Sequence, residues 1–267
     1  MTPFDRYLAA WNLVPDGAPM RTPSSHLLPV RRGGEPAMLK IAHADEERRG
    51  VALMRWWDGD GAARVLAHDG DALLLERATG PRSLRRMAIA GEDDEACRIL
   101  CAVAARLHAP RPRPPPALTP LRRWFAGLEA AARAHGGLFA RAWDAACRLL
   151  DDPREVVPLH GDLHHDNVLD AGARGWIAID PKHVIGERGF DLANLFANPD
   201  AHAAQAPGRF ARRVHVVAAA AGCERRRLLR WVLAQAGLSA AWLLADGEAP
   251  DDRLAIARLA AAELERS

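Results

Sequence analysis

Three polar side chains in the second half of the chain are of the types that phosphoryl transfer requires. Asp162 and Asn167 lie five positions apart, and Asp180 follows thirteen positions later, at the end of an apolar stretch. One carboxylate can orient or deprotonate an accepting hydroxyl, while an amide oxygen and a second carboxylate can hold Mg²⁺ on nucleotide phosphates. The spacing therefore predicts a phosphoryl-transfer site built on these three residues.

The segment around Asp162 fits a catalytic-loop pattern. His160, Asp162, Leu163 and Asn167 match the protein-kinase template H-R-D-L-x-x-x-N, but Gly161 stands where that template has arginine. A strand ending in Asp at the observed distance strengthens the match.

Lysine occurs only at positions 40 and 182, since the other basic residues are Arg. Lys40 ends the strand-like segment Ala-Met-Leu-Lys, where kinases carry the lysine that pairs with nucleotide phosphates. We expect Lys40 to bind phosphate and Glu47, on the helix that follows, to hold it as an ion pair. Asp45 and Glu46 are competing partners, but they also suit a helix N-terminus.

The histidines of this loop allow a second interpretation. His160, His164, His165 and Asp166 are of the types that bind zinc, so a metal hydrolase is an alternative. No second ligand cluster is visible, which favours the kinase interpretation. We expect His160 to brace the loop by hydrogen bonds; His164 and His165 are unassigned and could contact phosphate or substrate.

Composition and charge exclude several classes of protein. The 267 residues are 26% charged and 49% hydrophobic, which indicates a globular chain with a sizeable core. A formal charge of +2 is too small to attract nucleic acid or an anionic membrane through the net charge of the protein. The N-terminus lacks a secretory signal, the apolar segment 231–245 is short for a spanning helix, and the four cysteines form no CxxC pair. We therefore expect a cytoplasmic protein without nucleic-acid or membrane partners.

The elements that would position these residues form two regions. Apolar stretches around Gly33-Gly34 predict a hairpin, a helix follows through Trp57, and strands are expected at 63–67 and 72–75. Residues 109–120 are a Pro-rich connector, which we interpret as a surface loop rather than an SH3-type ligand. Helices are expected at 92–108, 121–134, 138–150, 190–196, 209–221, 224–245 and 251–265, with short strands flanking the loop at 160–167. The sequence thus predicts an α+β protein with a β-rich N-lobe (1–78) and a mostly α-helical C-lobe (79–267).

The loop His160-Gly161-Asp162-Leu163-His164-His165-Asp166-Asn167 resembles the HGDxHxxN signature of the aminoglycoside phosphotransferase superfamily, which has a two-lobed protein-kinase-like fold. The resemblance extends to the streptomycin 6-phosphotransferase branch, the aminoglycoside/hydroxyurea antibiotic-resistance kinases. Segments 36–40, 56–65, 93–101, 174–181 and 237–242 carry that resemblance, which covers nearly the whole chain.

The resemblance implies a role for each matching position. Asp162 would be the catalytic base, Asn167 and Asp180 would bind Mg²⁺, and Lys40, paired with Glu47, would bind ATP phosphates. The remaining implied roles are phosphate cover by Ser24 and Ser25, adenine contact by backbone groups near Arg77 and Ala78, and support of the catalytic loop by Asp191.

Two departures from protein kinases concern the segment after Asp180. Asp180-Pro181-Lys182 replaces Asp-Phe-Gly, and Lys182 could touch phosphate or point to solvent. The distance from Asp180 to Asp191 leaves no room for an activation segment, which argues for a small-molecule acceptor.

A streptomycin-like acceptor carries guanidinium groups, so carboxylates should line its pocket. The candidates are Glu187, Asp200, Asp246 and Glu248, with Asp251 and Asp252 nearby; for each, a solvated loop is the alternative. Trp231 and Trp242 are expected in the core.

The function implied by the resemblance is ATP-dependent phosphorylation of the streptomycin 6-hydroxyl, conferring resistance, by a monomer. The alternatives are the same chemistry on another aminoglycoside, an amino alcohol, a sugar or hydroxyurea, and, more remotely, a nucleotide-binding pseudokinase.

Overall fold

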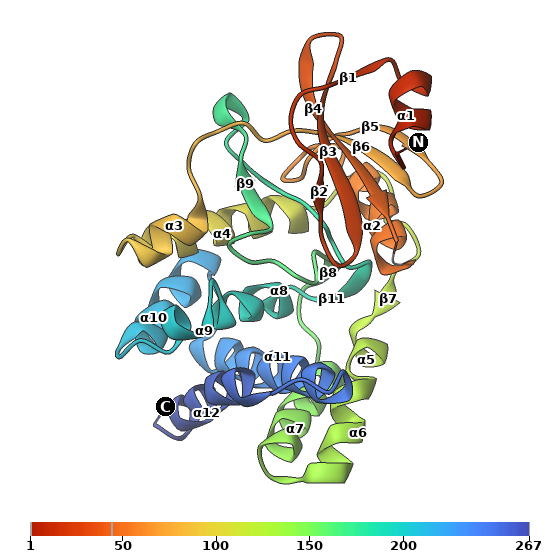
Figure 1. Ribbon diagram of the computed structural model, residues 1–267. Coiled ribbons are helices and arrows are strands. Elements are labelled where there is room, and N and C mark those ends of the chain that lie inside the picture. The colour runs from red at the N-terminus through yellow and green to blue at the C-terminus, as the bar shows by residue number, and fades with distance from the viewer. Residues whose placement is uncertain (1, 44, 267) are drawn as a thin grey trace.

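The computed structural model describes residues 2–43 and 45–266, and for residues 45–47 the backbone alone. After a short helix, α1 (Asp5–Ala10), the N-terminal region forms an antiparallel six-stranded sheet (Figure 1). Its strand order is β1 (Leu13–Pro15), β3 (Ser25–Arg32), β4 (Glu35–Ala42), β6 (Ala72–Glu76) and β5 (Val65–Asp69), with β2 (Met20–Arg21) paired to β3.

The predicted hairpin is confirmed as β3 and β4. Gly33 and Gly34 connect them with φ values of 56° and 88°, a left-handed turn that glycine adopts without steric cost. The predicted helix is α2 (Asp45–Trp57), which follows β4. In this register Lys40 lies between Leu27 of β3 and Leu73 of β6, so the lysine is held on a central strand.

The C-terminal region is mostly helical, as predicted. Figure 1 shows its helices gathered below the sheet, with two small sheets between them. The strands of those sheets are β9 (Val168–Asp170) with β10 (Trp176–Ala178), and β7 (Thr119–Pro120), β11 (Val184–Glu187) and β8 (Val156–Leu159). The helices are α3 (Leu84–Ile89), α4 (Asp93–His108), α5 (Leu121–Trp124), α6 (Ala126–His135), α7 (Gly137–Asp151), η1 (Gly172–Arg174), α8 (Gly189–Ala193), η2 (Asn194–Ala197), α9 (Ala201–Ala204), α10 (Arg209–Ala221), α11 (Arg225–Ala245) and α12 (Asp251–Glu265).

The largest apolar cluster fills the helical region and continues into α2. It includes Trp57 together with Leu100, Phe190 and Trp231, whereas the sheet has a smaller cluster of its own. Trp231 is 1% exposed, which confirms its predicted place in the core. The apolar core of the C-lobe therefore extends into residues that belong to the N-lobe in the sequence.

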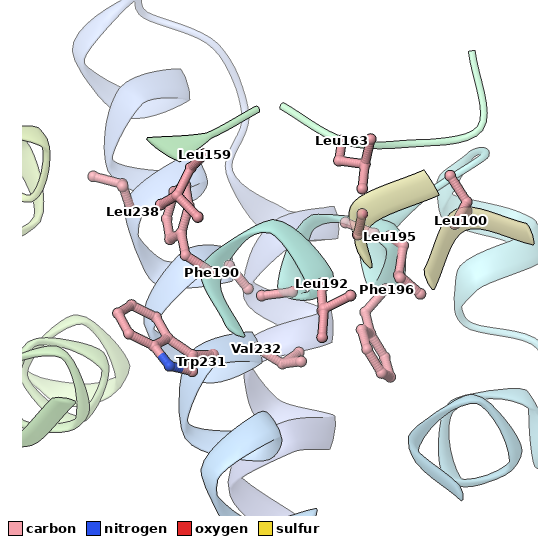
Figure 2. Close-up of a cluster of buried hydrophobic side chains, with 14 of the residues drawn as sticks. Leu100, Leu159, Leu163, Phe190, Leu192, Leu195, Phe196, Trp231, Val232 and Leu238 are labelled. Carbon is pink, nitrogen blue, oxygen red and sulfur yellow. The ribbon is translucent and has the colours of Figure 1, made fainter. Parts of the chain in front are cut away.

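Helix α11 is long and apolar enough to cross a membrane by length and composition, although the segment 231–245 alone is shorter. Most of it is buried inside the helical region, including Val232 and Leu238 in Figure 2. Its apolar character is accounted for by this packing.

Candidate active site

The catalytic loop runs from the end of β8 to the start of β9 and is anchored by two leucines. Leu159 and Leu163 are fully buried, and Figure 2 shows them reaching the same apolar cluster as Phe190 and Leu195. These anchors fix the polar residues between and after them. The loop sequence alternates apolar anchors with polar groups, which is why it leaves the sheet and still keeps a defined conformation.

Asp191 supports the turn of the loop, as predicted for it. Its carboxylate accepts hydrogen bonds from the backbone N–H of His160 (2.8 Å) and of Gly161 (2.7 Å), and it lies 2.8 Å from His108 Nε2. Although burial opposes ionisation, the bonds from His108 and from the loop leave the pKa of Asp191 below its usual range. An ionised carboxylate at the start of α8 thus holds the loop backbone.

His160 braces the loop from the inside, as expected. Its Nε2 donates to the carbonyl of Ile179 (2.7 Å), and its Nδ1 accepts from the backbone N–H of Asp162 (3.2 Å). Burial lowers the pKa of His160, so the ring is neutral and both bonds require the same tautomer. One side chain therefore connects the position of Asp162 to the segment after β10 that carries Asp180.

Two amides orient the carboxylate of Asp162. Asn194 donates from Nδ2 to Oδ1 (2.9 Å), while Asn167 donates from Nδ2 to the backbone carbonyl (2.9 Å) and lies 3.4 Å from Oδ2. Gln235 on α11 donates in turn to Asn194 Oδ1 (3.0 Å). The side chain of Asp162 is 35% exposed, so an acceptor can reach it. Sequence reasoning missed Asn194 and Gln235, although Asn194 follows Asp191 by three positions in the same helical segment.

Asn167 contacts Asp162, and Asp180 pairs with Lys40. The amide nitrogen of Asn167 is engaged by Asp162, which leaves its oxygen available, and the N–H of Ile179 donates to the Asn167 carbonyl (3.0 Å). Asp180 has a φ of 60° and lies 2.6 Å from Lys40 Nζ. An amide oxygen and a carboxylate are oxygen ligands of the kind Mg²⁺ prefers, so these residues fit the predicted metal. The side chain of Glu47, the predicted partner of Lys40, lies outside the described residues.

The predicted nucleotide contacts lie on the sheet side of this group. Ser24 is in the turn before β3, but Ser25 is fully buried, which does not fit a hydroxyl that covers phosphates. The guanidinium of Arg77 pairs with Asp16, and the backbone N–H of Arg77 donates to the carbonyl of Pro36 (3.4 Å). Only the adjoining backbone groups and Ala78 therefore remain for adenine. The adenine contact stays a prediction.

A cavity of about 710 Å³ opens in front of Asp162. Its walls come from the catalytic loop, from α5, from η2 and from one face of α11. The lining residues are Arg49, Thr119, Arg123, Trp124, Gly161, Asp162, His164, Lys182, His183, Asn194, Asn198, Gln235, Ser239, Trp242, Asp246 and Arg253.

Of the carboxylates predicted to meet the substrate, Asp246 alone is in this lining. The prediction for Glu187 was wrong: its side chain is buried, and its carboxylate accepts from Arg227 and from Trp231 Nε1 (2.8 Å). Asp200 caps α9 by accepting from the N–H of Ala203 (2.9 Å) and pairs with Arg85 (3.0 Å). Glu248 is exposed outside the cavity.

The prediction that Trp242 of α11 lies in the core was wrong. Trp242 is 37% exposed and lines the cavity instead of lying in the core. The reason is its place on α11: it lies seven residues after Gln235, which brings it to the same helix face.

The remaining loop residues differ in their surroundings. His164 and Lys182 line the cavity, whereas His165 is buried and neither of its ring nitrogens has a hydrogen-bond partner among the described residues. Burial lowers the pKa of His165 to about 3, so this ring is neutral. Among the described residues, no three His, Cys, Asp or Glu side chains gather in a group that could hold a metal ion, which gives the zinc alternative no ligand set.

A β-rich N-lobe, a helical C-lobe and this loop define the class of kinase-like phosphotransferases. The model of the aminoglycoside/hydroxyurea antibiotic resistance kinase family matches residues 10–247. The chain belongs to this family, and its predicted fold and family are therefore confirmed.

Two relatives and one solved structure illustrate the similarity. A streptomycin 3''-kinase of Klebsiella pneumoniae is 55% identical over 242 residues, covering 89% of this chain and 91% of the relative. A streptomycin 6-kinase of Streptomyces griseus is 32% identical, covering 91% and 82%. A mutant aminoglycoside phosphotransferase crystallised with ADP and hygromycin B has a TM-score of 0.68 at 16% identity, covering 99% and 98%, and shares the fold.

Proposed function

We propose that this chain transfers the γ-phosphoryl group of ATP to a hydroxyl of streptomycin, a reaction that inactivates the antibiotic. The observation that carries this proposal is the carboxylate of Asp162, which opens onto the cavity and is oriented by Asn194 and Asn167. Asn167 contacts it directly, and the pair of Asp180 and Lys40 supplies a second oxygen ligand and a lysine for the phosphates. Kinase chemistry needs this set of groups and no covalent intermediate on the protein.

Each residue then has a defined part in the transfer. The Asp162 carboxylate accepts the proton of the attacking hydroxyl, whose oxygen bonds to the γ-phosphorus as the bond to ADP breaks. Lys40 offers its ammonium to the phosphates once it is released from Asp180. Asn167 and Asp180 would hold Mg²⁺, which neutralises charge on the transferred group. His164 stays neutral because burial lowers its pKa, so it does not compete with the acceptor for Asp162.

The acceptor position is a finer part of the proposal. The resemblance read from the sequence implied the 6-hydroxyl, while the relative at 55% identity is named for the 3''-hydroxyl and those named for the 6-hydroxyl are 32% and 34% identical. We favour the 3''-hydroxyl. The chemistry on another aminoglycoside, an amino alcohol, a sugar or hydroxyurea is the alternative.

The test is ADP release by the purified protein with Mg·ATP and streptomycin, kanamycin, choline, hydroxyurea or no acceptor. We expect stimulation by streptomycin and a loss of at least ~100-fold in kcat for Asp162→Asn, because the base is removed while the volume is kept. Asp166→Asn is the matched control, since Asp166 is an exposed carboxylate of the same loop. Nucleotide binding without release for any acceptor would contradict the proposal and favour the pseudokinase.

A further inference from the structure

The far end of the cavity carries a carboxylate and an aromatic wall that the phosphoryl-transfer chemistry does not use. Gln235, Ser239, Trp242 and Asp246 all line the cavity. Their spacing of four, three and four residues places them on one face of α11. This face runs from Gln235, which supports the catalytic base, to Asp246, the C-cap residue of the helix.

The cavity lining contains two carboxylates, Asp162 and Asp246, and phosphoryl transfer uses Asp162. Asp246 is therefore available to a ligand. The charged residues around the cavity are otherwise Arg49, Arg123, Lys182 and Arg253, together with Asp162, which Asn194 and Asn167 already orient. Asp246 makes no ion pair with any residue that the structure describes, and it is exposed. A cationic group of a ligand would therefore meet its opposite charge at Asp246.

The neighbouring aromatic pair is held in place and presents an accessible face. Trp124 and Trp242 meet edge to face, with ring centroids 5.6 Å apart and an interplanar angle of 85°. Gly127 lies beside the indole of Trp242: a Cβ at this position would be 3.5 Å from the ring, an ordinary van der Waals distance. Trp242 is 37% exposed, and the N–H of Trp124 is buried without a described acceptor. A planar cation can stack on the exposed part of such a wall.

We propose that Trp242, Trp124 and Asp246 form a subsite for a guanidinium group of the acceptor. A guanidinium is planar, stacks on aromatic faces and donates paired hydrogen bonds to a carboxylate, so it matches both parts of this wall. The inference rests on the proposed function, because streptomycin is the acceptor that carries guanidino groups. It goes further by assigning residues that select this substrate.

The length of α11 gives the subsite a second consequence. Gln235 is linked to Asp162 through Asn194 by hydrogen bonds of 3.0 Å and 2.9 Å, whereas Asp246 lies eleven residues further along. At a rise of 1.5 Å per residue, this is about 16 Å along the helix axis. In streptomycin the 6-hydroxyl is on the guanidino-bearing ring, and the 3''-hydroxyl is on the ring at the opposite end. Binding of the guanidino ring near Asp246 therefore brings the 3''-hydroxyl toward Asp162.

The experiment compares Asp246→Asn and Trp242→Leu with Glu248→Gln, an exposed carboxylate near Asp246 that lies outside the cavity. Streptidine, the guanidino ring alone, is the probe, and its binding is followed by tryptophan fluorescence. We expect Asp246→Asn to weaken streptidine binding and raise KM for streptomycin roughly tenfold, with a smaller change in kcat, because one charge-assisted contact is lost. Trp242→Leu, read by streptidine competition in the ADP assay, should act in the same direction, and Glu248→Gln should match the wild type.

The phosphorylated product, examined by NMR, should carry phosphate on the ring without guanidino groups. Unchanged streptidine binding in Asp246→Asn, or phosphate on the guanidino ring, would overturn the subsite. Failure of the proposed function is a different result: the wild type then releases no ADP with streptomycin. Even in that case the streptidine titrations of the wild type and Asp246→Asn still decide whether the subsite exists.

Discussion

The catalytic loop turns at Gly161 in a conformation that residues with a Cβ rarely adopt. Its φ is 82°, and a Cβ would lie 2.8 Å from both Lys182 Cβ and Val184 Cγ2. We expect Gly161→Ala to lower kcat at least ~100-fold, because relief of these contacts displaces the adjacent Asp162 by a fraction of an ångström or more. ADP release with streptomycin measures this effect.

Gly91→Ala is the control for backbone strain alone. Gly91 has a φ of 96° but no atom within 4 Å of the Cβ position. The Gly91→Ala variant should have a free energy of unfolding about 1 kcal/mol lower than the wild type and an unchanged kcat. Equal loss of activity in both variants would show that packing against Lys182 and Val184 is not what requires glycine in the catalytic loop.

His165 makes stability depend on pH. Burial lowers its pKa to about 3, against about 6.5 in an unfolded chain. Because the folded pKa is the lower one, the unfolded state binds the extra proton between these values, and stability falls as pH drops below about 6.5. At pH 5 the loss from this one side chain is about 2 kcal/mol.

We expect His165→Leu to remove that loss and to be neutral or stabilising at pH 7, because no hydrogen bond of the ring is broken. Urea unfolding at pH 7 and pH 5 measures the difference, with the exposed His68→Leu as control. An identical pH dependence in the wild type and His165→Leu would mean that this ring is not buried as a neutral group.

At the scale of elements, local pattern predicted those parts whose conformation is set by neighbouring residues. The Gly33-Gly34 hairpin, helix α2 and the long C-terminal helices follow from turn chemistry and apolar periodicity. The strand β11 was missed because its four residues include Gly186 and pair with β7 and β8, which are distant in sequence. The short helices α3 and α9 carry too few residues for a periodic signal.

The same distinction applies to the site. Asp162, Asn167 and Asp180 could be predicted because they lie in one loop and just after the next strand, where spacing carries information. Asn194 and Gln235 act through contacts between η2, α11 and the loop, which no local spacing encodes. The prediction that Glu187 contacts the substrate failed for the same reason. The sequence shows a carboxylate seven residues after Asp180, whereas only the packing shows that Arg227 and Trp231 surround it.

At the scale of the whole molecule, α2 belongs to the core of the C-lobe although it lies within the N-lobe of the sequence. Trp57 is 1% exposed, donates from Nε1 to the carbonyl of Leu107 (3.0 Å) and lies nearly parallel to His160, with ring centroids 6.3 Å apart. The sheet's own cluster is small, and a core of that size rarely folds independently. The two lobes should therefore unfold together.

Replacement of Trp57 tests this coupling, because the side chain joins α2 to α4 and to the catalytic loop. We expect Trp57→Ala to lower the free energy of unfolding by about 3–5 kcal/mol, the range for a large buried aromatic residue, while far-UV circular dichroism and tryptophan fluorescence still report one coincident transition.

Ile89→Ala is the matched truncation on the surface, since Ile89 is 56% exposed, and it should change stability by less than about 1 kcal/mol. If Trp57→Ala instead gave two separate unfolding transitions, α2 would be a part of the N-lobe alone. A single coincident transition at lower stability would mean that α2 couples the stability of the C-lobe to β4, the strand that holds Lys40.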